Sequence, residues 1–204
     1  MSTGVYDTAT IPRHPFGLPL GSVRAFMSLL ICGFFWMILL WPNAQVAKPL
    51  LGHFFLLALV LMAFSSAPTT HSEGESALLP WILRVLFVGG SVAVVGYALL
   101  NDPAQFNARM KPDPAELTDW WGPLMAVTAA GFAVGLLLRV VLGRYNTVFL
   151  TLRSWLGLVG MIMLALEFAL FLAFLSSDSK TDMFFRYWQA VELGVVAAYF
   201  GARS

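Results

Sequence analysis

The chain has 204 residues, of which 59% are hydrophobic and only 11% are charged. A soluble globular domain carries about 25% charged residues, so this composition excludes an ordinary water-soluble protein and favours one surrounded by lipid. The formal net charge of +1 gives no basic field of the kind that attracts nucleic acid. The single cysteine, Cys32, excludes an intrachain disulfide framework.

The N-terminal segment, residues 1–22, is polar and contains three prolines, Pro12, Pro15 and Pro19. It is too long and too rich in proline for the charged start of a signal peptide, so we expect the first apolar run to be an uncleaved anchor. Ser22 is placed to cap this first helix, and Arg24 is placed to extend its side chain to the lipid head groups. The remaining residues, 23–204, form the predicted transmembrane domain.

A helix needs about 20 residues to cross the hydrocarbon layer of a membrane, and six apolar segments meet this requirement. The predicted spans are residues 23–41, 50–67, 79–100, 120–142, 151–176 and 183–201. The start of the sixth segment is amphipathic, so a partly interfacial position remains an alternative for it. The sequence therefore predicts an all-α, polytopic integral membrane protein with a bundle of about six transmembrane helices.

Loop charges predict the orientation. If the N-terminus is cytoplasmic, seven basic residues lie on that side: Arg13, Arg24, Arg84, Arg139, Arg144, Arg153 and Arg203. Five lie on the other side: Lys48, Arg109, Lys111, Lys180 and Arg186. The positive-inside rule then favours two cytoplasmic termini, and we expect a bacterial inner membrane.

Six tryptophans lie within a turn or two of a predicted helix end, as expected for anchors at the membrane interface. Together with Arg24, these predicted anchors are Trp41, Trp81, Trp120, Trp121, Trp155 and Trp188. Between the third and fourth spans, Asp113 and Pro114 are followed by Glu116, a pattern of the capping-box kind. It predicts a short surface helix that leads into the fourth span.

Small residues recur within the predicted spans. Because helices in lipid associate through close packing, we expect contacts at Gly89, Gly90, Gly96, Gly131, Gly135 and Gly194. The contacts can lie within the bundle, which we favour, or at an interface between subunits.

Two carboxyl groups, Glu167 and Glu192, lie deep within the fifth and sixth predicted spans. An ionised group at the centre of a bilayer costs about 2.5–3.5 kcal/mol, so such residues usually face a partner or a water-filled cavity. Their sequence distances from the intervening turn, centred near residue 179, are almost equal, which predicts equal depths in the membrane. If the two side chains meet, they would share a proton, as a relay or as a hydrogen bond between helices.

No set of catalytic, cofactor-binding or metal-binding residues can be assembled. His53 alone cannot supply both axial ligands of a haem, and His71 with Glu73 and Glu75 is better explained as a solvated turn. The only expected bound molecule is lipid. The expected partners are membrane lipids and other membrane subunits or further copies of the chain.

The first functional prediction is a structural or accessory subunit of a larger membrane complex, acting through helix packing and lipid contact. The alternative is a small proton-coupled transporter or channel subunit that uses Glu167 and Glu192. A membrane-embedded enzyme is a distant third.

Overall fold

The computed structural model describes residues 22–41, 49–65, 78–143, 146–173 and 183–203. Outside these ranges lie all of the N-terminal segment except Ser22, and the loop residues Lys48, His71, Glu73, Glu75, Arg144 and Lys180. The described residues form helices and contain no strand. The prediction of an all-α protein is therefore confirmed over this part of the chain.

Every predicted span contains a helix, with ends that differ from the prediction by at most four residues. These helices are α1 Ser22–Leu40, α2 Leu51–Ser65, α3 Leu78–Asn101, α6 Trp121–Leu142, α7 Thr147–Ala173 and α8 Met183–Gly201. Two short helices, α4 Pro103–Met110 and α5 Pro114–Asp119, lie between α3 and α6.

Four of the described helices, α1, α3, α6 and α7, are long and apolar enough to cross a membrane. The number six is not confirmed, because α2 has only 15 residues and α8 falls outside this group. One face of α8 is nevertheless buried, because it packs against α2, α6 and α7. A helix face covered by other helices can carry polar side chains that would be costly against lipid. The low hydropathy of α8 therefore does not by itself exclude it from the transmembrane bundle.

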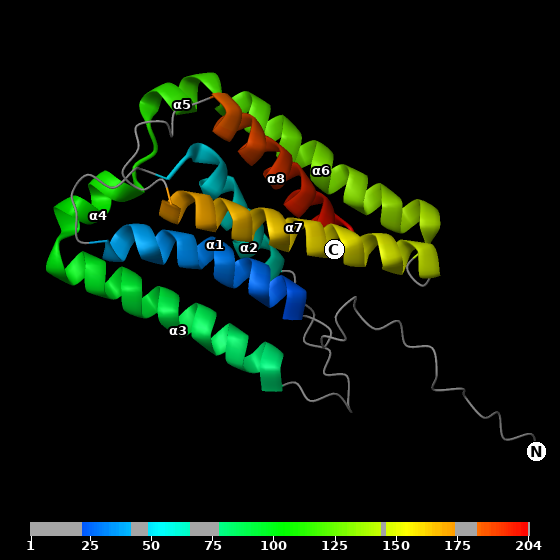
Figure 1. Ribbon diagram of the computed structural model, residues 1–204, viewed down its shortest axis with the longest axis horizontal. Coiled ribbons are helices and arrows are strands. Elements are labelled where there is room, and N and C mark those ends of the chain that lie inside the picture. The colour runs from blue at the N-terminus through cyan, green and yellow to red at the C-terminus, as the bar shows by residue number, and fades with distance from the viewer. Residues whose placement is uncertain (1–21, 42–48, 66–77, 144–145, 174–182, 204) are drawn as a thin grey trace, which may run out of the picture.

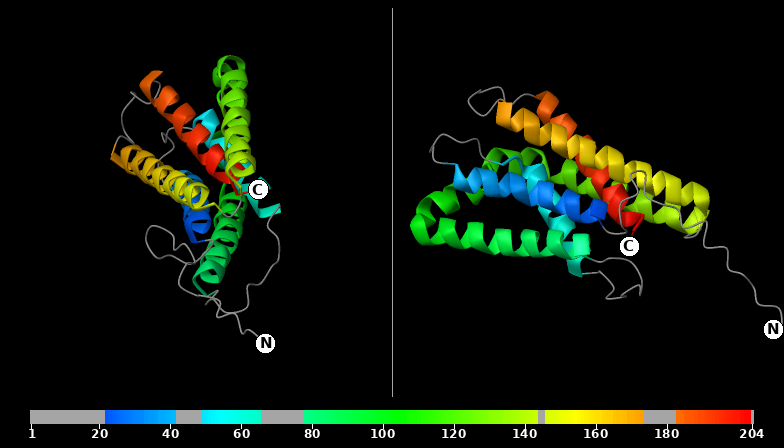
Figure 2. Two further views of the ribbon diagram at one scale, coloured as in Figure 1. Left: turned by 90° about the vertical axis from the view of Figure 1, so that its right-hand side faces the viewer. Right: turned by 60° about the horizontal axis from the view of Figure 1, so that its bottom comes forward.

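Successive long helices run in opposite directions along the chain, so that the neighbours α1, α3 and α7 run one way and the neighbours α6 and α8 run the other (Figures 1 and 2). The helix α8 makes its most extensive contact with α6, whereas α3 packs mainly against α1, which in turn packs against α7. The start of α1 and the end of α8 point toward one end of the bundle, and α4 and α5 lie at the other. We call the latter the α5 end.

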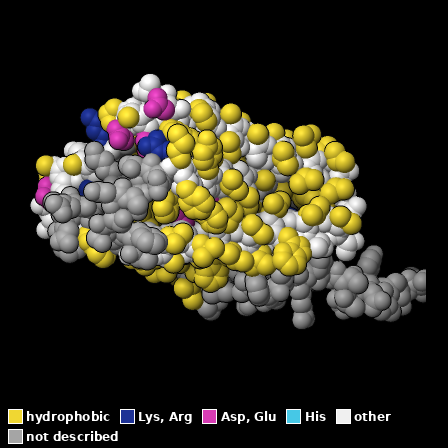
Figure 3. All heavy atoms as spheres, turned by 45° about the horizontal axis from the view of Figure 1, so that its top comes forward, with side chains coloured by type: hydrophobic (Ala, Val, Ile, Leu, Met, Phe, Trp, Pro, Cys, Tyr) yellow, Lys and Arg dark blue, Asp and Glu magenta, His cyan; other side chains and the backbone are white. Residues whose placement is uncertain are grey.

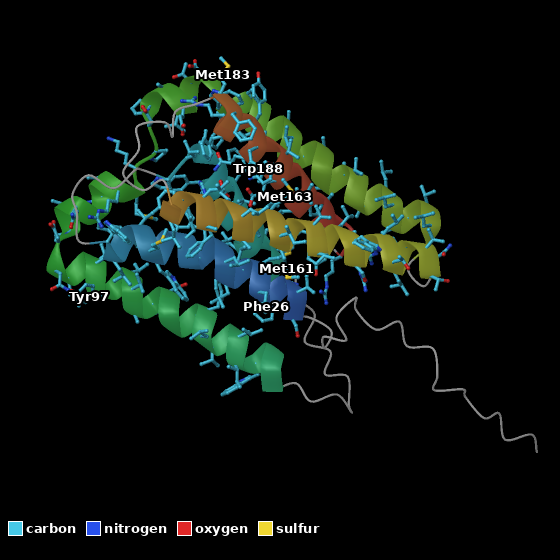
Figure 4. The ribbon with its side chains drawn as sticks, viewed as in Figure 1. Phe26, Tyr97, Met161, Met163, Met183 and Trp188 are labelled. Carbon is cyan, nitrogen blue, oxygen red and sulfur yellow. The ribbon has the colours of Figure 1, made fainter. Side chains whose placement is uncertain are left out.

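Large apolar side chains cover the outer surfaces of α3, α6 and α7. Figure 3 shows hydrophobic side chains over most of one face of the bundle, with charged groups gathered near one end. Tyr97 points away from α3, as Figure 4 shows, and 60% of its surface is exposed. An apolar exterior of this extent is suited to lipid, since soluble monomers rarely expose large continuous apolar patches. The structure thus supports an integral membrane protein.

Glycines bring α6 and α8 into close contact. A Cβ atom at Gly131 would overlap the carbonyl oxygen of Gly194, and one at Gly135 would overlap the carbonyl oxygen of Ala198. From the other side, a Cβ at Gly201 would overlap the carbonyl oxygen of Phe132. These backbones touch because no side chain separates them, which is the packing that small residues permit in lipid.

The glycines of α3 divide between two environments. Gly90 receives the indole ring of Trp36, whose Nε1 donates a hydrogen bond to the Ser91 hydroxyl at 3.2 Å. Gly89 and Gly96 have no atom within 4 Å of an added Cβ and lie on the open side of the helix. The predicted packing positions therefore lie partly within the bundle and partly on a surface that no described residue covers.

The predicted surface helix before residue 120 is confirmed as α5, and the Asp113 carboxylate accepts a hydrogen bond from the Ala115 amide at its start. The assignment of Glu116 to this cap is wrong. Its Oε2 accepts a hydrogen bond from the Leu51 amide at 2.9 Å instead, so it stabilises the start of α2. Helix N-termini present unpaired amides and positive partial charge, which favour a carboxylate there.

Two further details differ from the sequence predictions. The Ser22 hydroxyl is buried and has no hydrogen-bond partner among the described residues, so it does not cap α1. The helix α4 was not expected, although Asp102 caps it by accepting a hydrogen bond from the Gln105 amide. Arg109 of α4 donates to the carbonyl oxygens of Ile38 and Leu39 and thereby satisfies the C-terminal end of α1.

Candidate functional site

Four buried polar side chains meet in the interior of the bundle, contributed by three helices. We call them the polar cluster: His53 from α2, Glu167 from α7, and Gln189 and Glu192 from α8. The Gln189 amide nitrogen lies 2.7 Å from His53 Nδ1, and His53 Nε2 lies 3.3 Å from the Glu167 carboxylate. A chain of polar contacts therefore crosses from α8 through α2 to α7.

The hydrogen bond from Gln189 fixes the proton on the histidine ring. An amide nitrogen donates, so His53 Nδ1 accepts and the proton of the neutral ring lies on Nε2, facing Glu167. If His53 takes up a second proton, Nδ1 becomes a donor as well. The Gln189 amide must then present its oxygen in place of its nitrogen. The orientation of this amide is thus linked to the charge of the histidine.

Glu192 is the most deeply buried member of the cluster, with 0% of its surface exposed. No described donor reaches either of its carboxyl oxygens. Its charged neighbour is the Glu167 carboxyl, which lies close enough to share a hydrogen bond if one of the two groups is protonated. Because native proteins pair almost all buried polar groups, a buried carboxyl whose neighbour is a second carboxyl is an unusual feature of the site.

Aromatic rings and one glycine hold the cluster in place. The ring of Phe34 stacks on the His53 imidazole with centroids 3.9 Å apart and an interplanar angle of 3°. A second ring, Phe35, meets the same imidazole edge to face. A Cβ atom at Gly52 would overlap the Gln189 side chain, so this glycine allows Gln189 to approach α2 closely enough to reach His53. The aromatic face of Phe34 is favourable for a protonated imidazole.

An ion pair joins α8 to α5 at the α5 end. Arg186 Nη2 is 3.6 Å from Glu116 Oε1, and the Arg186 guanidinium lies over the Trp120 ring, 5.7 Å from its centroid. Arg186 precedes Gln189 by three residues on α8, and Gln189 precedes Glu192 by three. A spacing of three places consecutive side chains on nearly the same face of a helix. A polar stripe therefore runs along α8 from the α5 end into the interior.

The predicted interface anchors occupy different environments. Trp81, Trp121 and Trp155 are exposed, as a side chain at a membrane interface requires. The others are half-buried within the protein: Arg24, Trp41, Trp120 and Trp188. Figure 4 labels Trp188 on α8 and Met163 on α7, the pair of helices that carries both glutamates.

Glu167 and Glu192 could be identified from the sequence, but their partners His53 and Gln189 could not be assigned to them in this way. His53 was considered only as a haem ligand, although an ionisable residue inside an apolar span is by itself a sign of a functional or paired group. Gln189 could have been found from the regular spacing of Arg186, Gln189 and Glu192. Its contact with His53 joins residues 136 positions apart, which no local pattern predicts.

Within the described residues, no group of three or more His, Cys, Asp or Glu side chains is placed to hold a metal ion. Comparison with protein-family models, with curated proteins and with solved structures finds no match to this chain. The function of this chain must therefore be inferred from the chemistry of the polar cluster.

Proposed function

We propose that this chain is a proton-binding membrane protein, acting as a small proton-coupled transporter or channel subunit with Glu167 and Glu192 at its centre. The observation that carries the proposal is the buried polar cluster inside a bundle with an apolar exterior. Such ionisable groups are costly in a membrane and usually serve ion pathways or proton relays.

Charge balance supports proton binding. The Nε2 proton of His53 can stabilise one carboxylate, because this nitrogen lies 3.3 Å from Glu167. No described cation is paired with Glu192, and a second uncompensated charge would be strongly unfavourable in the interior. We infer that the cluster holds one exchangeable proton in addition to the proton on the histidine ring. Neighbouring carboxyls titrate as a pair, so this proton belongs to the cluster as a whole.

The proposed location is a bacterial inner membrane with both termini in the cytoplasm. The support is the distribution of the described arginines, since Arg24, Arg139, Arg153 and Arg203 belong to helix ends remote from the α5 end. The positive-inside rule assigns such an end to the cytoplasm. The α5 end then faces the opposite side of the membrane.

The test is proton flux into proteoliposomes, followed with an internal pH-sensitive dye under an imposed membrane potential. Glu167→Gln combined with Glu192→Gln should abolish the flux, because an amide of the same shape cannot exchange a proton. Asp119→Asn provides the matched control, since it makes the same chemical change at an exposed position on α5. Equal flux in the wild type and the double variant would sink the proposal.

A second measurement reads proton binding without transport. A buried protonated carboxyl gives an infrared carbonyl band that shifts in heavy water, and this band should disappear in Glu192→Gln. Its absence from the wild-type protein would contradict the inference of a bound proton even if flux were observed.

We propose, as the second candidate, a structural or accessory subunit of a larger membrane complex. The supporting observation is the open side of α3, where Gly89 and Gly96 face no described residue and a helix of another subunit could approach closely. Purification in a mild detergent should then recover the chain together with a membrane partner. Recovery of a single, monodisperse chain would argue against this role.

A further inference from the structure

A small pocket lies between α2, α5, α6 and α8, beside the Glu116–Arg186 ion pair. Its lining consists of Leu51, Glu116, Trp120, Leu124, Arg186 and Gln189. The volume available inside it is about 10 Å³, close to the minimum that one water molecule needs. The pocket is partly open, so this position is not sealed within the protein.

The pocket offers the polar partners that a bound water requires. Glu116 is 6% exposed and Gln189 is 3% exposed, and both side chains contribute to the lining together with the Arg186 guanidinium. A buried water usually makes about three hydrogen bonds to such groups. A charged donor, a carboxylate acceptor and an amide give a water molecule in this space three polar partners, and the apolar side chains of Leu51, Trp120 and Leu124 complete the lining.

Gln189 belongs to both the pocket and the polar cluster. Its side chain lines the pocket, and its amide nitrogen contacts His53 Nδ1. It is therefore the side chain that separates the pocket from the imidazole. Gln189 also contacts Glu167, which in turn contacts both His53 and Glu192. From the α5 end inward, the ion pair and the pocket come first, then Gln189, and then His53 with the two carboxyls.

We propose that this pocket is a water site and that it is the access path by which protons reach the polar cluster from the α5 end. The inference rests on the proposed function, because it names the route to the same buried carboxyls. Glu116 and Arg186 form the outer boundary of the path, and Gln189 is the inner barrier.

The proton transfer balances without any further reactant. When Gln189 turns away from His53, a protonated water in the pocket gives its proton to Nδ1. The Nε2 proton passes to the Glu167 carboxylate, and the ring is left neutral with its proton on Nδ1. The titratable or charged groups along this path are Glu116 from α5, Arg186 and Glu192 from α8, His53 from α2 and Glu167 from α7. The facing positions from α1 and α6 are occupied by Phe34 and Leu124, which do not titrate.

The water site can be tested in the full-length wild-type protein by radiolytic hydroxyl labelling in lipid, with the products located by mass spectrometry. Radicals formed from a bound water modify the side chains beside it. Leu124 of the pocket is only 3% exposed, and Leu164 on α7 is a matched control at 5%. We expect Leu124 to be modified several-fold faster than Leu164. Equal, slow modification of the two leucines would overturn the proposal.

A variant then tests the inner barrier. Gln189→Ala should raise the oxidation rate of His53 several-fold, since pocket water would reach the imidazole. An unchanged rate in a variant that unfolds at the wild-type temperature would show that Gln189 is not the barrier. If Gln189→Ala fails to fold, the comparison of the two leucines in the wild type still decides whether the pocket holds water.

Labelling does not depend on proton flux, so the water site and the proposed function can be refuted independently of each other. Rapid labelling of Leu124 supports the water site even if the double glutamine variant keeps its flux, a result that would refute the proposed function alone. Slow labelling of Leu124 with loss of flux in that variant would refute this access path and leave the proposed function standing.

Discussion

Replacing Glu192 by methionine should make the protein more stable while removing its proton-linked activity. The side chain is 0% exposed, and its carboxyl oxygens meet no described donor and face the Glu167 carboxyl. An unsatisfied buried polar group costs about 1–3 kcal/mol, and apolar replacement of buried ionic groups is often stabilising by a similar amount. Methionine is unbranched and flexible enough to fill the space left by the glutamate. We therefore expect the free energy of unfolding to rise by about 1–3 kcal/mol.

The assay is thermal unfolding in detergent, followed by intrinsic tryptophan fluorescence, with proton flux measured on the same preparation. For a soluble chain of this size, each kcal/mol shifts the Tm by about 2–4 °C, so a rise of several degrees is expected. Two further variants provide reference values for the change in Tm. Leu193→Met changes an adjacent, fully buried apolar residue and should be nearly neutral. Glu167→Met removes the carboxylate that faces His53 and should lower the Tm.

A fall in the Tm of Glu192→Met by an amount similar to that of Glu167→Met would refute the reasoning. It would mean that the Glu192 carboxyl makes a structural bond that fastens helices together. The experiment thereby separates the two roles considered for the carboxyl pair from the sequence, a relay and a hydrogen bond between helices.

Two further predictions concern glycines, the first read by thermal unfolding and the second by NMR. Gly135→Ala should lower the free energy of unfolding by about 1–3 kcal/mol, because the added Cβ would overlap the α8 backbone. Gly96→Ala has open space and should raise the free energy of unfolding by up to about 1 kcal/mol through helix propensity. A stabilising Gly135→Ala together with a destabilising Gly96→Ala would contradict the packing described for α6 and α8. Gly52→Ala should displace Gln189 from His53 and change the tautomer signals of the imidazole in ¹⁵N NMR spectra. Gly33→Ala, at a helix position with open space, should leave those signals unchanged.

The helices could be located from the sequence because apolar runs of sufficient length are a local property. Their division into lipid-facing and interior helices could not, since it depends on which helices surround which. The segment that forms α8 shows the difference. It was predicted as a span, and its amphipathic start left a partly interfacial position as an alternative, but Gln189 and Glu192 lie in the interior, where other helices cover them.

The candidate site was half predicted for the same reason. Equal depth of Glu167 and Glu192 followed from their distances to one turn, which is local information. The approach of His53 depends on how α2 packs against α8, and the role of Glu116 depends on the position of the α2 N-terminus. These contacts arise only when the bundle is assembled. A polar residue in an apolar span indicates that it has a partner, but the sequence does not show which residue that partner is.

The polarity of α8 has a consequence for biogenesis. During synthesis each segment partitions into the membrane according to its own composition, and α8 is less suited to lipid than α1, α3, α6 or α7. It follows α6 and α7 in the chain, and both pack against it in the final bundle. We expect α8 to insert efficiently only when these helices are already in place to receive it. Until then His53 and Glu167 lack their α8 neighbours, Gln189 and Glu192. The polar cluster is therefore complete only when the last helix has entered the membrane.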